Sequence, residues 1–235
     1  MADQLTDQGQ KFGLPDSDIA TAAKEFVYTV SPEFVAHHCV RSYLFAREIA
    51  AAQGLRADVD YDDELVFLSC MLHDLGATEQ GNGDQRFEVD GADAAAQFLR
   101  ERAVPEAEIN TVWQAIALHT SAGLAPRFGA VQGIAHLGIG TDIIGIGRQL
   151  LPSGFADRVH EAFPRHNLGY ALAEVIARQA QDNPLKAPPL SFSGHVHQLM
   201  NPEAPQLTWF DLVENAGWGD LPVGSVAPGS PRSSV

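Results

Sequence analysis

The stretch 65–75 constrains the fold most, because its apolar residues point in all directions around a helix. A helix of this kind has no solvent-facing side and lies in the interior of a packed domain. An acidic start at residues 62–63 and Gly76 after the stretch suit the two ends of such a helix. Near its end lies an adjacent pair, His73 and Asp74. We therefore expect an imidazole and a carboxylate inside the core, where each needs a partner.

Two other polar residues interrupt apolar patterns. His38 lies in the apolar stripe of a helix predicted between Ser31 and Gly54, whereas its neighbour His37 points to the side of that stripe. Asp142 lies in the run IAHLGIGTDIIGIG, which contains no lysine or arginine.

A buried carboxylate costs several kcal/mol unless it is paired or bound to a metal. One divalent cation held by His38, His73, Asp74 and Asp142 would satisfy all four side chains. Each residue alone has a simpler alternative: a hydrogen-bonded core histidine for His38, a helix cap for Asp74, and a pair with Arg127 or Arg148 for Asp142.

Helical patterns follow one another from about residue 17 to about 182, and no alternating strand pattern occurs. Beyond the two helices already named, we expect helices over five ranges: 89–103, 106–120, 126–147, 155–163 and 168–182. The fold class is therefore all-α, with a single helical bundle over 31–185. An N-terminal extension covers 1–30, and an irregular, proline-rich C-terminal segment covers 186–235, ending in a disordered tail over the last dozen residues.

Composition excludes several classes of partner. Thirty acidic against fifteen basic side chains give a formal net charge of −15, which disfavours nucleic acid and anionic membranes. No apolar run is long enough to span a membrane. The polar N-terminus and the widely spaced Cys39 and Cys70 predict a cytoplasmic protein with reduced thiols. Apolar residues over 207–212 suit packing in a homo-oligomer or over the chain's own site.

The motifs His38-x-x-Arg41, LHDLG and TDIIG resemble the HD-domain superfamily of metal-dependent hydrolases, over about residues 31–185. The spacings of 35 residues (73 − 38) and 68 residues (142 − 74) look normal for that superfamily. The resemblance implies an HD-domain helical bundle with one divalent metal ion, held by the two histidines and two aspartates of these motifs.

A narrower resemblance, to the cyanamide hydratase branch, lies in HDLGAT, RFEVDGADAAAQFL and ALHTSAG. It implies zinc, with iron or manganese as other candidates, and hydration of a nitrile carbon by a metal-bound hydroxide, as in cyanamide to urea. Asp74 would then also accept a hydrogen bond from the bound water, and Thr78 and Phe87 would line the substrate pocket. His119, at the margin of its helix's apolar stripe, is the candidate general acid, or else a hydrogen-bonded boundary residue.

Many phosphohydrolase members carry a lysine or arginine just after the HD-x-G turn, where this chain has Ala77. We therefore expect a small, uncharged substrate. The main alternative is an HD phosphohydrolase acting on a nucleotide or phosphomonoester, with Arg41, Arg86 and Arg127 supplying the positive charge. Two others are a two-iron oxygenase, using His119 and His136, and a catalytically silent metal-binding module.

Overall fold

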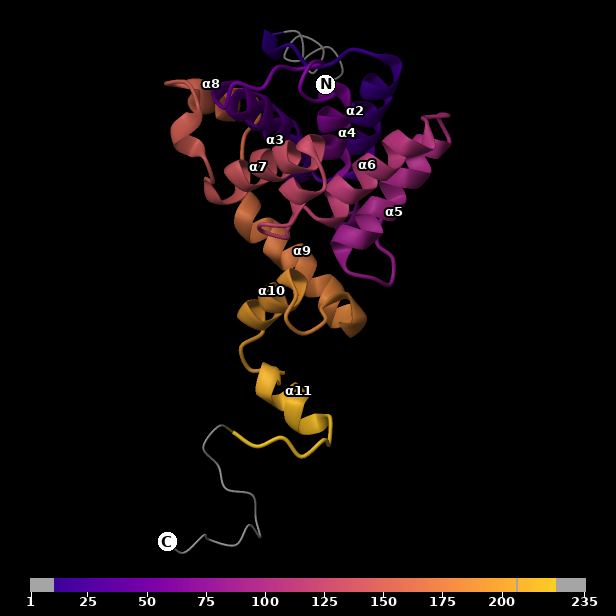
Figure 1. Ribbon diagram of the computed structural model, residues 1–235, viewed down its shortest axis with the longest axis vertical. Coiled ribbons are helices and arrows are strands. Elements are labelled where there is room, and N and C mark those ends of the chain that lie inside the picture. The colour runs from indigo at the N-terminus through magenta and orange to yellow at the C-terminus, as the bar shows by residue number, and fades with distance from the viewer. Residues whose placement is uncertain (1–10, 206, 223–235) are drawn as a thin grey trace, which may run out of the picture.

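The computed structural model describes residues 11–205 and 207–222, which contain ten α-helices and no strand (Figure 1). The all-α prediction is thereby confirmed. The α-helices are α2 (Asp18–Val30), α3 (Glu33–Ala52), α4 (Asp63–Leu72), α5 (Phe87–Arg100), α6 (Glu106–Ala117), α7 (Ala130–Ile144), α8 (Phe155–Ala162), α9 (Leu168–Asp182), α10 (Phe192–Met200) and α11 (Trp209–Asn215). Within the described part of the chain, no helix is long and apolar enough to cross a membrane.

Helices α3 and α7 lie side by side in the middle of the helical body (Figure 1). The glycine-rich sequence of α7 permits this close approach: a Cβ atom on Gly138 would lie 2.2 Å from the Ser42 carbonyl oxygen and 2.4 Å from the Ala46 Cβ. The pairing brings His38 on α3 next to Asp142 on α7.

Helix α3 is buried more widely than a single apolar stripe predicts. Every residue from 35 to 46 is buried, including His37 and Arg41, while Phe34 is only half-buried. The helix begins at Glu33, with Pro32 as its N-cap and no side-chain cap. The wide burial arises because α3 is enclosed by several elements, so its polar residues face other side chains instead of water.

Helix α4 begins where the sequence predicts but ends before the predicted stop at Gly76. Asp62 caps it by accepting a hydrogen bond from the Leu65 amide at 2.9 Å, and every residue from 65 to 72 is buried. The helix ends at Leu72, so His73 and Asp74 occupy the turn before a short 3₁₀ helix, η1 (Leu75–Ala77). This turn places both side chains inside the body of the molecule.

The C-terminal segment contains more helix than predicted, whereas the helical pattern that begins near residue 17 forms α2. Helix α2 falls within the predicted extension 1–30, yet its buried face packs into the main core. The segment expected to be irregular contains α10 and α11, which extend beyond α9 at one end of the molecule (Figure 1). Side-chain caps stabilise the starts of α10 and α11. Ser191 accepts a hydrogen bond from the Gly194 amide at the start of α10, and Thr208 and Asp211 form a capping box at the start of α11. The tail predicted over the last dozen residues lies outside the described residues.

Candidate metal centre

Three of the four predicted ligands converge at one point. His38 Nε2 lies 3.1 Å from His73 Nε2 and 3.7 Å from Asp74 Oδ2, and His73 Nε2 lies 3.3 Å from the same oxygen. The three residues come from α3 and from the turn after α4, and each exposes 1% of its surface or less. The separations are close to those between the ligands of one tetrahedrally bound ion with bonds of about 2.0–2.2 Å.

The hydrogen bonds of the two imidazoles fix which nitrogen faces the centre. His73 Nδ1 lies 2.8 Å from the Cys70 carbonyl oxygen, which can only accept, so Nδ1 carries the proton. His38 Nδ1 donates in the same way to the Asp142 carboxylate at 2.7 Å. In their neutral forms both histidines therefore direct an Nε2 lone pair toward the Asp74 carboxylate. Three electron-rich groups that meet in the core require a positive charge between them.

The Asp74 carboxylate itself also requires a positive charge beside it. Both of its oxygens are buried and neither has a hydrogen-bond partner among the described residues. Burial opposes its charge, but His73, together with His38 and His119, holds the pKa of Asp74 below its usual value. For His73, burial likewise opposes charge, yet Asp74 raises its pKa well above the ordinary value. The donor set of two imidazoles and one carboxylate fits a divalent metal of the zinc, iron or manganese kind.

Asp142 lies on the other side of His38 and does not join the three converging groups. Its carboxylate accepts bonds from Arg41 Nε and Nη2, at 2.7–3.0 Å, and from Arg165 Nη1 at 2.8 Å. These partners differ from the two arginines considered from sequence, because they come from α3 and from the loop before α9. In this arrangement Asp142 orients the His38 ring and fixes the proton on Nδ1, so that Nε2 faces the centre. Its role as a fourth direct ligand stays a prediction.

His119 lies beside the cluster, with its ring centroid 5.1 Å from that of His73. Its Nδ1 donates to the Ile116 carbonyl oxygen at 2.6 Å, which leaves Nε2 with a free lone pair. Burial, followed by the charge of His73, lowers the pKa of His119 to about 4. Its assignment as the general acid stays a prediction.

The two predicted pocket residues occupy different settings. Phe87, the first residue of α5, places its ring centroid 5.5 Å from that of His119. The Thr78 hydroxyl donates to the Leu75 carbonyl oxygen at 2.7 Å and accepts from the Gly81 amide at 3.2 Å. Phe87 is thus adjacent to His119, whereas the Thr78 hydroxyl is engaged in its own turn. Substrate contact by either residue stays a prediction.

A fully buried carboxylate near His119 was missed from the sequence. Glu88 accepts from Arg86 Nη2 at 2.6 Å and from the Thr120 hydroxyl at 2.7 Å. Burial opposes its charge, but the bond from Arg86 and the nearby His119 lower its pKa. A helical-phase count over 87–100 would have found it, since Glu88 shares a face with the buried residues Ala92, Ala95 and Leu99.

Comparison with known families supports the motif analysis. A family model of the HD domain matches residues 35–150, a region that contains all four predicted ligands. No curated protein matches the chain. The match supports the HD superfamily and leaves the narrower branch open.

Proposed function

We propose that this chain, which carries an HD domain over residues 35–150, is a metal-dependent enzyme that adds water to a small, uncharged nitrile-type substrate such as cyanamide. One observation carries the proposal: three groups with lone pairs, His38 Nε2, His73 Nε2 and the Asp74 carboxylate, converge in the core. These residues would hold the metal ion. When bound, a divalent metal activates water by lowering its pKa to about 7 and polarises the group under attack.

The remaining chemistry falls to residues of the chain. Hydration of a nitrile joins the oxygen of water to carbon and moves one proton from that oxygen to nitrogen. His119 suits this transfer because its Nδ1 is already bonded to Ile116, so the lone pair on Nε2 can take the proton and then deliver it. Thr120 and Arg86 hold Glu88 in the vicinity of His119, and the Phe87 ring supplies an apolar wall.

Two of the three arginines assigned to a phosphorylated substrate are already engaged, and the third, Arg127, is exposed. Arg41 is completely buried and bonded to Asp142 and to two backbone carbonyl groups, and Arg86 is bonded to Glu88. Ala77 follows the His-Asp turn in place of a basic residue. The almost complete burial of the cluster also favours a substrate of few atoms. These features support the hydratase over the phosphohydrolase.

A substrate panel with metal analysis tests the proposal. Purified full-length protein is loaded with zinc, iron or manganese and assayed with cyanamide, simple nitriles, nucleotides and phosphomonoesters. We expect urea from cyanamide or an amide from a nitrile, no phosphate release, and loss of activity in His73→Ala. His195→Ala, which removes an exposed histidine on α10, serves as the matched control. Phosphate release without nitrile hydration would replace the proposal by the phosphohydrolase.

A further inference from the structure

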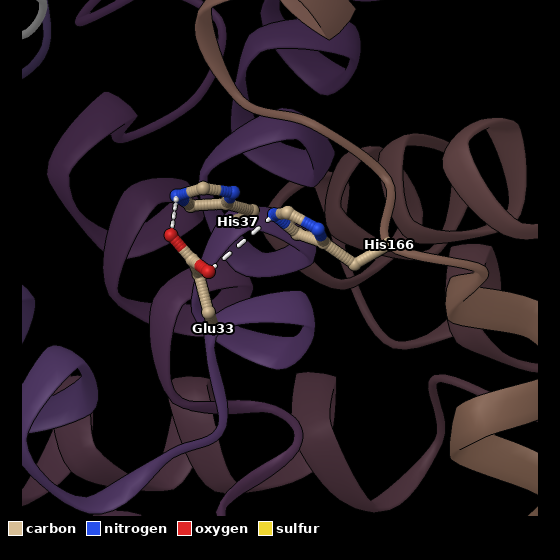
Figure 2. A group of neighbouring side chains, drawn as sticks. All are labelled: Glu33, His37 and His166. Atoms are coloured by element: carbon tan, nitrogen blue, oxygen red, sulfur yellow. Dashed lines mark ion pairs between the residues drawn. The ribbon is translucent and has the colours of Figure 1, made fainter.

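A second group of metal-ligating side chains lies outside the buried centre. Glu33 and His37 lie one turn apart at the start of α3, and His166 lies in the loop before α9 (Figure 2). Figure 2 shows one oxygen of the Glu33 carboxylate directed at His37 and the other at His166. Nothing in the proposed catalytic chemistry uses these three residues.

The distances suit a shared ion. Glu33 Oε1 lies 3.9 Å from His37 Nε2, and Glu33 Oε2 lies 3.6 Å from His166 Nε2. One ligand atom from each of the three residues falls within 4.8 Å of the others. Ligands bound to one zinc ion at about 2.0–2.2 Å lie roughly 3.3–3.6 Å apart, so rotations of the exposed Glu33 and His166 side chains would close the remaining gap.

The orientation of His37 is set by the backbone. Its Nδ1 lies 3.2 Å from the Pro164 carbonyl oxygen, which can only accept, so Nδ1 is the donor and Nε2 carries the lone pair. That lone pair faces the Glu33 carboxylate instead of a hydrogen-bond donor. A metal-bound histidine usually donates from one ring nitrogen to a backbone carbonyl or carboxylate while the other nitrogen faces the ion.

The loop that carries His166 is held from both sides. The Pro164 carbonyl oxygen accepts from Arg41 Nη1 at 2.9 Å as well as from His37, and Arg165 is bonded to Asp142. His166 itself has a φ of 49°, a conformation that costs energy in a residue other than glycine. The fold thus keeps His166 opposite Glu33 at some conformational cost.

We propose that Glu33, His37 and His166 form a second site, which binds a divalent metal of the zinc class at the surface. Two imidazoles and one carboxylate match the ligand preference of zinc, and water completes the shell because the site is open. The side chains of Glu33 and His166 are 64% and 42% exposed, so an ion reaches them directly from solvent. The inference does not depend on the proposed hydratase activity.

Equilibrium dialysis against Zn²⁺, followed by metal analysis, tests the site on the full chain. Glu33→Gln removes the charged ligand, and His166→Asn removes an imidazole while keeping a residue that tolerates positive φ. Each variant is expected to bind one zinc equivalent fewer than the wild type. His195→Ala, which removes an exposed histidine outside the cluster, is expected to bind as much as the wild type.

Circular dichroism and the zinc-induced rise in Tm complete the design. Both variants are expected to keep the helical spectrum of the wild type, because the substituted side chains are exposed. His73→Ala should lose the zinc ion of the buried centre and retain that of the surface site, so the zinc content of the variants distinguishes the two sites. Wild-type zinc content in both Glu33→Gln and His166→Asn would overturn the inference, and so would an equal loss in His195→Ala.

Discussion

We expect removal of the Arg41 guanidinium to destabilise the protein more than removal of any other charged group on α3. Arg41→Met keeps much of the side-chain stem but removes donors to the Asp142 carboxylate and to the carbonyl groups of Phe163 and Pro164. The arginine is fully buried, so water cannot replace these bonds.

The expected loss of stability depends on the bonds that Asp142 keeps in this variant. Asp142 keeps its bonds to Arg165 and His38, at 2.8 and 2.7 Å, so its charge is not wholly uncompensated. Removing one partner of a buried ion pair typically costs about 3–5 kcal/mol. We expect a cost in that range, which for a protein of this size lowers Tm by about 6–20 °C, at roughly 2–4 °C per kcal/mol.

Urea unfolding followed by circular dichroism measures the cost, with Arg165→Met as the matched control. Arg165 binds the same carboxylate, but its side chain is 34% exposed, so its loss should cost about 1 kcal/mol. Equal costs for the two variants, or a cost for Arg41→Met under about 1 kcal/mol, would refute the view that the buried arginine holds α3, α7 and the 163–165 loop together.

Three further variants test other parts of the structure. Gly138→Ala should lower the free energy of unfolding in urea by about 1–3 kcal/mol, because its Cβ would overlap Ser42 and Ala46 on α3. Gly169→Ala has open space around it and should not destabilise the protein, so equal effects of the two variants would contradict the close packing of α3 on α7. Lys186→Met should cost about 3–5 kcal/mol in the same assay, because it leaves the buried Asp90 carboxylate without its ammonium partner. Breaking the exposed Arg100–Glu106 pair should have little effect on stability. Glu88→Gln should lower turnover about 10-fold with metal content unchanged, and a parallel loss of metal would show that Glu88 supports the ligands and not His119.

The sequence predicted the parts of the site that depend on local pattern. The apolar run of α4 placed His73 and Asp74 in the core, and the structure buries both completely or nearly so. His38 was found because an imidazole in an apolar stripe is anomalous within its own helix. Each of these signals lies within a few helical turns of sequence.

Features that depend on contacts between distant segments were not predictable in the same way. The partners of Asp142 are Arg41 and Arg165, which lie 101 and 23 residues away in sequence, so no local pattern identifies them. The second site, formed by Glu33, His37 and His166, combines a local and a distant contact. Glu33 and His37 are one helical turn apart, whereas His166 joins them only through the packing of its loop on α3.

The central claim is that His38, His73 and Asp74 hold one divalent metal ion inside the region that the HD-domain family model matches. Metal analysis of His166→Asn, in which the surface site is removed, isolates the buried centre after dialysis without chelator. We expect one metal ion per chain in this variant and only trace metal once His73→Ala is added. Trace metal in His166→Asn itself, or a full equivalent retained without His73, would contradict the claim.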